Sequence, residues 1–482
     1  MLAALASSTN PPIVADQAAL RALALEAAKA GRVAVDLEAS GMFTYRARLC
    51  TVQLAWDGRM AVVDALAAPV PVLADLLGSA GPWKIVHDVA FDARVLAEAG
   101  IELGKVHDTA IAAQMLGRSA TGLASLVASE LGVSAEGPGG DRPQTSAAGP
   151  AGDRPQTSAA GPAGDRPQTS PAGPAGDRPP TKKSMQQYDW RRRPFDAVML
   201  AYLASDVLHL AALEQKLWTE VCARGIEAEV LEETRYRIAC AVDAVRHPRQ
   251  EPVYLRVKGV DRLSDRERAA LFVLAELRER EAERKDVPPH RVASADALLA
   301  LARTRPRTRA DVARVRGVDP SGSFAEELVA ALAGAPESLP PEERARFDRP
   351  RPAPEVVKLR RGREARLLAW RRTEAQRRGV DEQVVLPGHC LKHAVGLDEG
   401  SAEELARVPG IGAFRVERDG AAISSAIRDD GTSAALPRRG QHQDGTSAAP
   451  PRRGQHQDAT SAAPDQNEGT PSPAEDETSG VE

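Results

Sequence analysis

The sequence predicts an α/β domain followed by small all-α domains, and three observations carry this prediction. Before residue 134, short apolar runs alternate with amphipathic stretches, which is typical of strands and helices packed in layers. From about residue 196 onward, apolar residues recur with helical spacing. Two blocks of low-complexity repeat interrupt and end this folded sequence.

The elements of the first domain follow from the positions of the apolar runs. The range 48–56 alternates apolar and polar residues, so we expect a strand there with an antiparallel neighbour. The expected elements, in chain order, are a helix over 16–30, a strand that contains Asp36, strands over 48–56, 60–66 and 83–87, and a helix that begins near Asp88.

Capping residues mark the starts of helices in the all-α part. Ser264 lies three residues before Glu267, which is the spacing of a capping box. Thr308 precedes Asp311 by the same spacing, and we expect the helix that it starts to end at Gly317.

The two low-complexity blocks lack the apolar positions that a folded repeat needs. Residues 140–179 repeat GDRPQTSAAGPA with a period of 12, and residues 430–464 repeat GTSAAPPRRGQHQD with a period of 14. Stacked structural repeats bury apolar side chains in a shared core. Because these repeats carry almost none beyond Ala and Pro, we expect both blocks to be disordered.

Charge, cysteine content and hydropathy exclude several classes of protein. The net charge of −4 gives no general sign of nucleic-acid binding, so any basic surface must be local. Cys50, Cys222, Cys240 and Cys390 lie far apart, which argues against a disulfide framework and favours a reducing compartment such as the cytoplasm. We find no uninterrupted apolar run of about 18 residues and therefore expect no membrane contact.

Two carboxylates, Asp36 and Glu38, follow the apolar run 33–35. Residues two apart in a strand lie on the same face, so we expect these side chains to be adjacent. Like charges at the end of a buried strand are costly unless a cation binds there. The pair marks either the point where the strand reaches solvent or part of a divalent-cation site.

A third carboxylate, Asp92, falls on the apolar face of the helix that is expected to begin near Asp88. Asp88 precedes the first turn and is the better candidate for a cap, which leaves Asp92 without that role. The expected apolar stripe of this helix consists of Phe91, Val95, Leu96 and Ala99.

The range 194–210 predicts a buried helix that carries Tyr202 and Asp206. The two residues are four apart, so they share a face beside the apolar stripe. On its own this spacing is a weak signal that occurs often by chance. Together with the three earlier carboxylates it becomes specific.

The complete set resembles the motifs of the DEDDy 3′–5′ exonucleases. The surrounding segments RLCTVQLAW, VHDTAIAAQMLG, GLASLVASELGV, YDWRRRP and YLASDVLHLAALEQKL are similar to those of ribonuclease D. The range 255–318 resembles the helicase-and-ribonuclease-D C-terminal (HRDC) module, and a weaker copy occupies 365–424.

This resemblance implies a DnaQ-like, ribonuclease-H-like exonuclease domain with a mixed sheet, followed by two all-α HRDC-type domains. The implied ranges are 13–134 and 181–222 for the exonuclease domain, 253–321 and 361–424 for the HRDC-type domains, 135–180 for the insert and 425–482 for the tail. The family has only a short connection where the insert stands here. A long insert is tolerated because the cost of loop closure grows only logarithmically with length.

The resemblance also implies a catalytic role for five residues. Asp36, Glu38, Asp92 and Asp206 would hold two divalent ions, Mg²⁺ or Mn²⁺, and Tyr202 would orient the nucleophilic water. The residue types fit independently, because Mg²⁺ prefers hard oxygen ligands. Two such ions can activate the attacking water and stabilise the leaving 3′ oxygen.

Nucleic acid would need a local basic surface, and the range 255–320 contains 16 Lys and Arg against 11 Asp and Glu. The candidates for phosphate contact are Arg303, Arg305, Arg307 and Arg309, because we expect the loop around them to have no acidic partners nearby. Phe43 and Tyr45, just after the strand with Asp36, would either stack on the terminal base or pack in the core.

The leading hypothesis is a metal-dependent 3′–5′ exoribonuclease of ribonuclease D type. The family further implies action on the 3′ ends of structured RNAs such as transfer RNA precursors, and the cysteine pattern favours the cytoplasm. One alternative is a DNA exonuclease, since the same fold and acids serve proofreading. Another is a non-catalytic RNA-binding protein with a relic site, although a relic should have lost an acid or the tyrosine, and none is missing.

Overall fold

The computed structural model describes residues 11–133, 185, 187–248, 251–318, 323–348 and 352–428. The insert expected at 135–180 lies outside these ranges. So does the expected tail, apart from residues 425–428, which are helical. The expected boundary at residue 424 therefore falls inside a helix.

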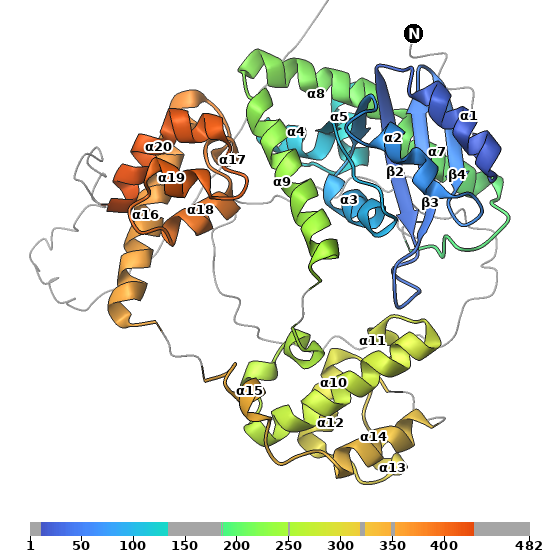
Figure 1. Ribbon diagram of the computed structural model, residues 1–482, viewed down its shortest axis with the longest axis vertical. Helices are drawn as coiled ribbons and strands as arrows, with labels where there is room; N and C mark the ends of the chain where they lie inside the picture. The colour runs from blue at the N-terminus through green and yellow to red at the C-terminus, as the bar shows by residue number, and fades with distance from the viewer. Residues whose placement is uncertain are drawn as a thin grey trace, which may run out of the picture. The chain divides into compact units, whose positions relative to one another are not determined.

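A six-stranded mixed sheet forms the centre of the first domain (Figure 1). Its strand order is β1-β4-β3-β2-β5-β6. β2 is antiparallel to β3 and parallel to β5, which places it in the middle of the sheet. The strands are β1 (Ile13–Val14), β2 (Arg32–Ala39), β3 (Leu49–Trp56), β4 (Arg59–Asp64), β5 (Trp83–Val86) and β6 (Val106–Asp108).

The strand β3 lies between two antiparallel neighbours, as its sequence predicts for at least one side. The expected alternation does not separate a core face from a solvent face, however. Every β3 residue except Ala55 is buried, because β3 is an interior strand of the sheet and α7 packs against it.

The helices encoded after the insert complete the cover of the sheet. α7 (Ala197–Leu208) packs against β2, β3 and β4, and α8 (Leu210–Arg224) packs against β2 and β5. α9 (Glu227–Arg246) packs against α3 (Val89–Glu98). The remaining α-helices that the structure describes in this domain are α1 (Gln17–Ala27), α2 (Ala74–Leu77), α4 (Thr109–Met115) and α5 (Leu123–Leu131).

By length and composition, the stretch Ala197–Arg224 would also pass as a membrane span, with a mean hydropathy of 1.4 in its most apolar window. Polar residues interrupt the stretch, so it contains no uninterrupted apolar run of about 18 residues. Half of that window is buried inside the protein, and the stretch packs on the sheet. Its apolar residues therefore contribute to the core of the α/β domain.

The all-α part has two further cores. α10 (Asp265–Lys285) packs against α12 (Ala295–Thr304) and α14 (Phe324–Ala333) around the first. α16 (Pro354–Arg378) packs against α18 (Gly388–Val395) and α20 (Ala413–Arg428) around the second.

The two helix starts that capping residues predicted are both present. Ser264 and Glu267 form a capping box at the start of α10, and the Thr308 hydroxyl accepts a hydrogen bond from the Asp311 amide. The prediction that the second helix ends at Gly317 is wrong. α13 is a single turn, Arg309–Val312, and Gly317 lies beyond it with a positive φ of 87°.

Candidate active site

The strand β2 places Asp36 and Glu38 on one face of the sheet, as their spacing predicts. Asp36 pairs with Gln53 of β3, and Glu38 pairs with Thr51. The register shifts directly after Glu38, so the regular ladder ends where the second carboxylate stands. The pair therefore lies at the carboxyl end of a central strand and has not reached a solvent-exposed loop.

The helix α7 brings Asp206 and Tyr202 to these carboxylates. Carboxylate oxygens of Asp36, Glu38 and Asp206 lie within 4.8 Å of one another, an arrangement that could hold a metal ion. Asp196 caps the helix and accepts a hydrogen bond of 2.8 Å from the Met199 amide. The structure thus joins residues that are far apart in the sequence into one acidic cluster.

Asp92 faces the same cluster from α3. Its side chain is buried, and burial followed by the charge of Asp36 raises the pKa of this carboxyl. Asp92 is not one of the three residues whose oxygens lie within 4.8 Å of one another. The predicted stripe of α3 needs one correction, because Phe91 is 47% exposed and the inward face carries Val89 and Ala93 in its place.

Asp108, which the sequence analysis did not single out, provides the cap that we expected from Asp88. The Asp88 side chain makes no capping hydrogen bond, whereas the carboxylate of Asp108 accepts one from the Val89 amide at 2.8 Å. Asp108 also caps α4 through the amides of Ala110 and Ile111. The position of Asp108 directly before a helical run could have identified it as the cap of α4. Its contact with the start of α3 arises only in the folded chain and has no signal in the sequence.

The electrostatics of the cluster favour a cation. Burial, and then the charges of Asp36 and Asp206, raise the pKa of Glu38 to about 9. Burial and the same acidic groups also raise the pKa of Tyr202, which hydrogen-bonds with Asp206. A divalent ion would compensate the like charges that otherwise favour protonation. The hard oxygen donors and their proximity therefore fit Mg²⁺ or Mn²⁺.

A buried amide oxygen beside the acids shows that the site contains a further polar group. Oε1 of Gln53 has no hydrogen-bond partner among the described residues, although Gln53 stands directly opposite Asp36 in the sheet. Buried polar atoms without a partner are uncommon. The site is thus polar beyond its carboxylates.

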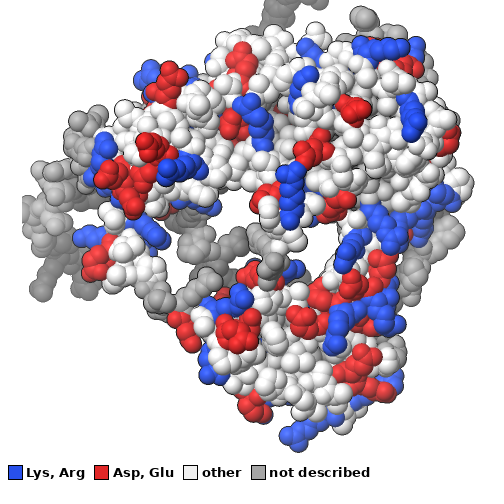
Figure 2. Space-filling model, in the orientation of Figure 1, with Lys and Arg blue, Asp and Glu red and all other residues white. Residues whose placement is uncertain are grey.

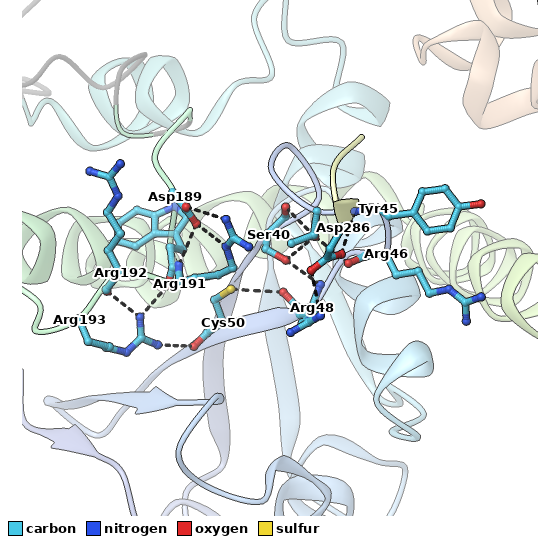
Figure 3. A network of polar contacts seen from close by, with 12 residues as sticks. Ser40, Tyr45, Arg46, Arg48, Cys50, Asp189, Arg191, Arg192, Arg193 and Asp286 are labelled. Carbon is cyan, nitrogen blue, oxygen red and sulfur yellow. Dashed lines mark hydrogen bonds and ion pairs between the residues drawn. The ribbon is translucent and has the colours of Figure 1, made fainter. Parts of the chain in front are cut away.

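The loop after β2 uses its aromatic rings in contacts with the chain itself. Tyr45 packs against the core that α10 helps to form, and its amide donates to Asp286 at 3.2 Å, as Figure 3 shows. The Arg291 guanidinium lies 5.1 Å from the centre of the Phe43 ring. Stacking of Phe43 or Tyr45 on a terminal base remains a prediction.

The four arginines of the predicted phosphate-binding segment differ in their surroundings. Arg305 lies 3.5 Å from Glu337, donates to the Ala335 carbonyl, and leaves only 17% of its side chain exposed. Arg309 lies 3.7 Å from Glu326. The expectation that this segment has no acidic neighbours is therefore wrong for these two.

Arg303 and Arg307 are exposed, as is Arg309. On the face drawn in Figure 2, basic and acidic side chains are interspersed over the all-α domains. Arg303 and Arg307 consequently remain the candidates for phosphate contact.

Two family models match the chain. A model described as a 3′–5′ exonuclease matches residues 11–137, and a model described as an HRDC domain matches 267–331 and 361–427. A ribonuclease D of Zymomonas mobilis is 28% identical over 340 residues, covering 69% of this chain and 74% of that protein. A ribonuclease D of Acidiphilium cryptum is 26% identical over 449 residues, covering 90% and 97%.

The chain is similar to ribonuclease D over most of its length, and it carries a 3′–5′ exonuclease domain and HRDC domains. It is a hydrolytic 3′–5′ exonuclease, and the weaker second HRDC-type copy that its sequence predicts is confirmed by the match over 361–427.

Solved structures show the same fold as this chain. The crystal structure of Escherichia coli RNase D has a TM-score of 0.58 and 20% identity, and the match covers 87% of this chain and 99% of that one. The catalytic core of RRP6 from Trypanosoma brucei has a TM-score of 0.51 and 20% identity, covering 68% and 80%.

Proposed function

We propose that this protein is a metal-dependent exoribonuclease that removes nucleotides from the 3′ ends of structured RNAs such as transfer RNA precursors, in the cytoplasm. The observation that carries the proposal is the cluster of Asp36, Glu38 and Asp206, whose oxygens lie within 4.8 Å of one another. RNA as the substrate follows from the ribonuclease D relatives. The intact set of four acids and Tyr202 argues against a relic site.

The four acids would bind two divalent ions, Mg²⁺ or Mn²⁺. The ions would supply charge stabilisation for the leaving 3′ oxygen and acidify the attacking water. Asp36 and Glu38 present oxygens from the rigid end of β2, and Asp206 presents oxygens from α7. Fixing ligands on two packed elements prearranges the site, so that binding the substrate requires little reorganisation.

Tyr202 would position the nucleophilic water. Its hydroxyl hydrogen-bonds with the carboxylates of Asp206 and Glu38, and its pKa is raised above the usual value for tyrosine, chiefly by burial. A raised pKa keeps the phenol protonated at neutral pH, so its hydroxyl is available as a donor and does not act as a general base. The hydroxyl therefore acts as a hydrogen-bond donor that orients groups at the metal site.

The proposal is tested with the purified full-length protein and Mg²⁺ on a 3′-tailed RNA and a DNA of the same sequence. We expect mononucleotides to be released progressively from the RNA 3′ end, and chelation of the metal should stop the reaction. Faster digestion of the DNA would overturn the choice of RNA. No digestion of either, in a protein that binds the RNA, would overturn the proposed catalysis.

Asp206→Asn and Asp88→Asn form a matched pair for this assay. Asp206→Asn should abolish release, because it removes a charged ligand while retaining the shape of the side chain. Asp88 makes no capping hydrogen bond and its side chain is 68% exposed, so Asp88→Asn should retain activity within about twofold.

A further inference from the structure

The segment 187–195, which leads directly into α7, joins the sheet to the helix that carries Tyr202. Trp190 and Phe195 of this segment are buried in a small core with Cys50 of β3 and Val62 of β4. The same core includes Leu200 and Leu203 of α7, and Tyr202 packs against it. The position of Tyr202 is therefore coupled to how this segment lies on the sheet.

A bidentate ion pair fixes the segment to the sheet. The Nε and Nη2 atoms of Arg193 each lie 2.6 Å from one carboxylate oxygen of Asp64, the last residue of β4. Nη2 also donates to the Cys50 carbonyl on β3 at 3.1 Å, a bond that Figure 3 shows. The Asp64 side chain is 10% exposed and that of Arg193 is 26% exposed, so solvent screens this pair only partly.

The same guanidinium holds the turn that contains Trp190. Nη1 of Arg193 donates to the Trp190 carbonyl at 2.6 Å. The central carbon of the guanidinium, Cζ, lies 4.0 Å from the centre of the Phe195 ring. One side chain thus connects both strands, the turn and Phe195, which lies two residues before the start of α7. A planar group with several donors is suited to this role, because its geometry is rigid once its acceptors are in place.

Trp190 passes this constraint to Tyr202. Its ring stacks on that of Tyr202 with 5.6 Å between centroids and 26° between planes. The ring of Tyr188 contacts the Trp190 indole in an edge-to-face arrangement, with 5.2 Å between the ring centroids. Trp190 is 1% exposed, so a rotation of the Tyr202 ring toward it would meet a packed side chain.

We propose that the Arg193–Asp64 ion pair, acting through Trp190, is a positioning device that holds the Tyr202 hydroxyl at the carboxylates of Glu38 and Asp206. This inference rests on the proposed role of Tyr202 in catalysis. The hydroxyl of Tyr202 hydrogen-bonds with Asp206 and Glu38, and its ring stacks on Trp190. The stacked indole and its anchor restrict the ring to the orientation in which the hydroxyl meets the acids.

The test exploits a neutral replacement of the pair. In Asp64→Asn/Arg193→Gln both charges are removed together, so that no buried charge remains without a partner. Arg193→Lys retains the charge but offers no bidentate fork. Arg191→Ala is the matched control, because Arg191 belongs to the same segment but pairs with Asp189 inside it, at 2.8 Å. Tyr202→Phe sets the scale for complete loss of the hydroxyl.

The measurements are kcat and KM on a short single-stranded RNA with Mg²⁺, together with Tm. We expect kcat of the neutral double variant to fall by about 10- to 100-fold at unchanged KM. The fall in kcat should be smaller in Arg193→Lys, and Arg191→Ala should have the wild-type kcat. In the Tyr202→Phe background, the same double change should produce almost no further loss, because both changes act on one hydroxyl.

Other results would overturn the inference. A wild-type kcat in the double variant would do so, and so would a fall that is equally large in the Tyr202→Phe background. If the double variant does not fold, Arg193→Lys in the two backgrounds decides the question by the same comparison. A wild-type kcat in Tyr202→Phe itself would remove the proposed role of Tyr202, which is a separate failure and is recognised from that single variant.

Discussion

Tyr202 of α7 hydrogen-bonds with Glu38 of β2, across the boundary between a helix and the central strand of the sheet. The same hydroxyl hydrogen-bonds with Asp206, one turn further along α7. One phenol therefore contacts carboxylates from both elements that build the acidic cluster. The hydroxyl contacts the acids, whereas the ring stacks on Trp190. A substitution that removes only the hydroxyl can therefore test its role by itself.

Removal of that hydroxyl should affect turnover more than binding. In Tyr202→Phe the ring still stacks on Trp190, whereas the hydrogen bonds to the two acids are lost. We expect kcat to fall by about 100-fold with KM almost unchanged, measured under single-turnover and steady-state conditions. Equal effects on kcat and on RNA affinity would instead assign the hydroxyl to substrate binding.

The pH dependence of stability should reveal the acidic cluster without any assay of activity. In the metal-free protein the pKa of Glu38 is raised to about 9, above the value in the unfolded chain, so the folded state binds the extra proton. Stability is then greatest at low pH in this window and is lost as pH rises from about 5 toward 9. Thermal unfolding in the presence of a chelator, at pH values across this window, measures the loss.

Mg²⁺ should reverse that loss, because the bound ion replaces the proton. The increase in Tm caused by Mg²⁺ should consequently be larger near pH 9 than near pH 6. Glu38→Gln removes the titrating group, and its metal-free Tm should vary less across the window. A wild-type Tm that responds to Mg²⁺ equally at both pH values would contradict a metal site at Glu38.

The local part of this site is predictable from the sequence because spacing determines which side chains share a face. A separation of two in a strand placed Asp36 beside Glu38, and a separation of four in a helix placed Tyr202 beside Asp206. The paired carboxylates and their helix partner therefore required no knowledge of the tertiary structure.

The long-range part was not predictable in this way. Asp64 and Arg193 meet only because the segment before α7 crosses two strands, and no periodic pattern relates them. The same holds for Asp108, whose sequence position suggests a cap for α4 but not for α3. Arg305 was misjudged because its acidic neighbour Glu337 is distant in sequence and close in space.

Replacement of the repeat insert tests a prediction that rests on sequence alone. Because residues 140–179 carry almost no apolar side chains beyond Ala and Pro, exchanging them for a short Gly/Ser linker should change neither kcat nor Tm. Thermal unfolding and RNA digestion by the exchanged protein provide the check. A lower Tm would mean that the repeats pack against the folded domains.

Substitution of Arg303 and Arg307 tests whether the first HRDC domain contacts RNA phosphates. Both side chains are exposed, whereas Arg305 is held by Glu337 and by backbone carbonyls. Each phosphate contact that is lost reduces the slope of log affinity against log salt by about 0.7 to 0.9. Arg303→Ala/Arg307→Ala should therefore weaken RNA binding, reduce the slope of log affinity against log salt by about 1.4 to 1.8, and raise KM without lowering kcat. Arg314→Ala is the matched control, because Arg314 is 80% exposed in the same domain but pairs with Asp311 at 3.1 Å. An identical salt slope in the wild type and the double variant would assign phosphate binding to other residues.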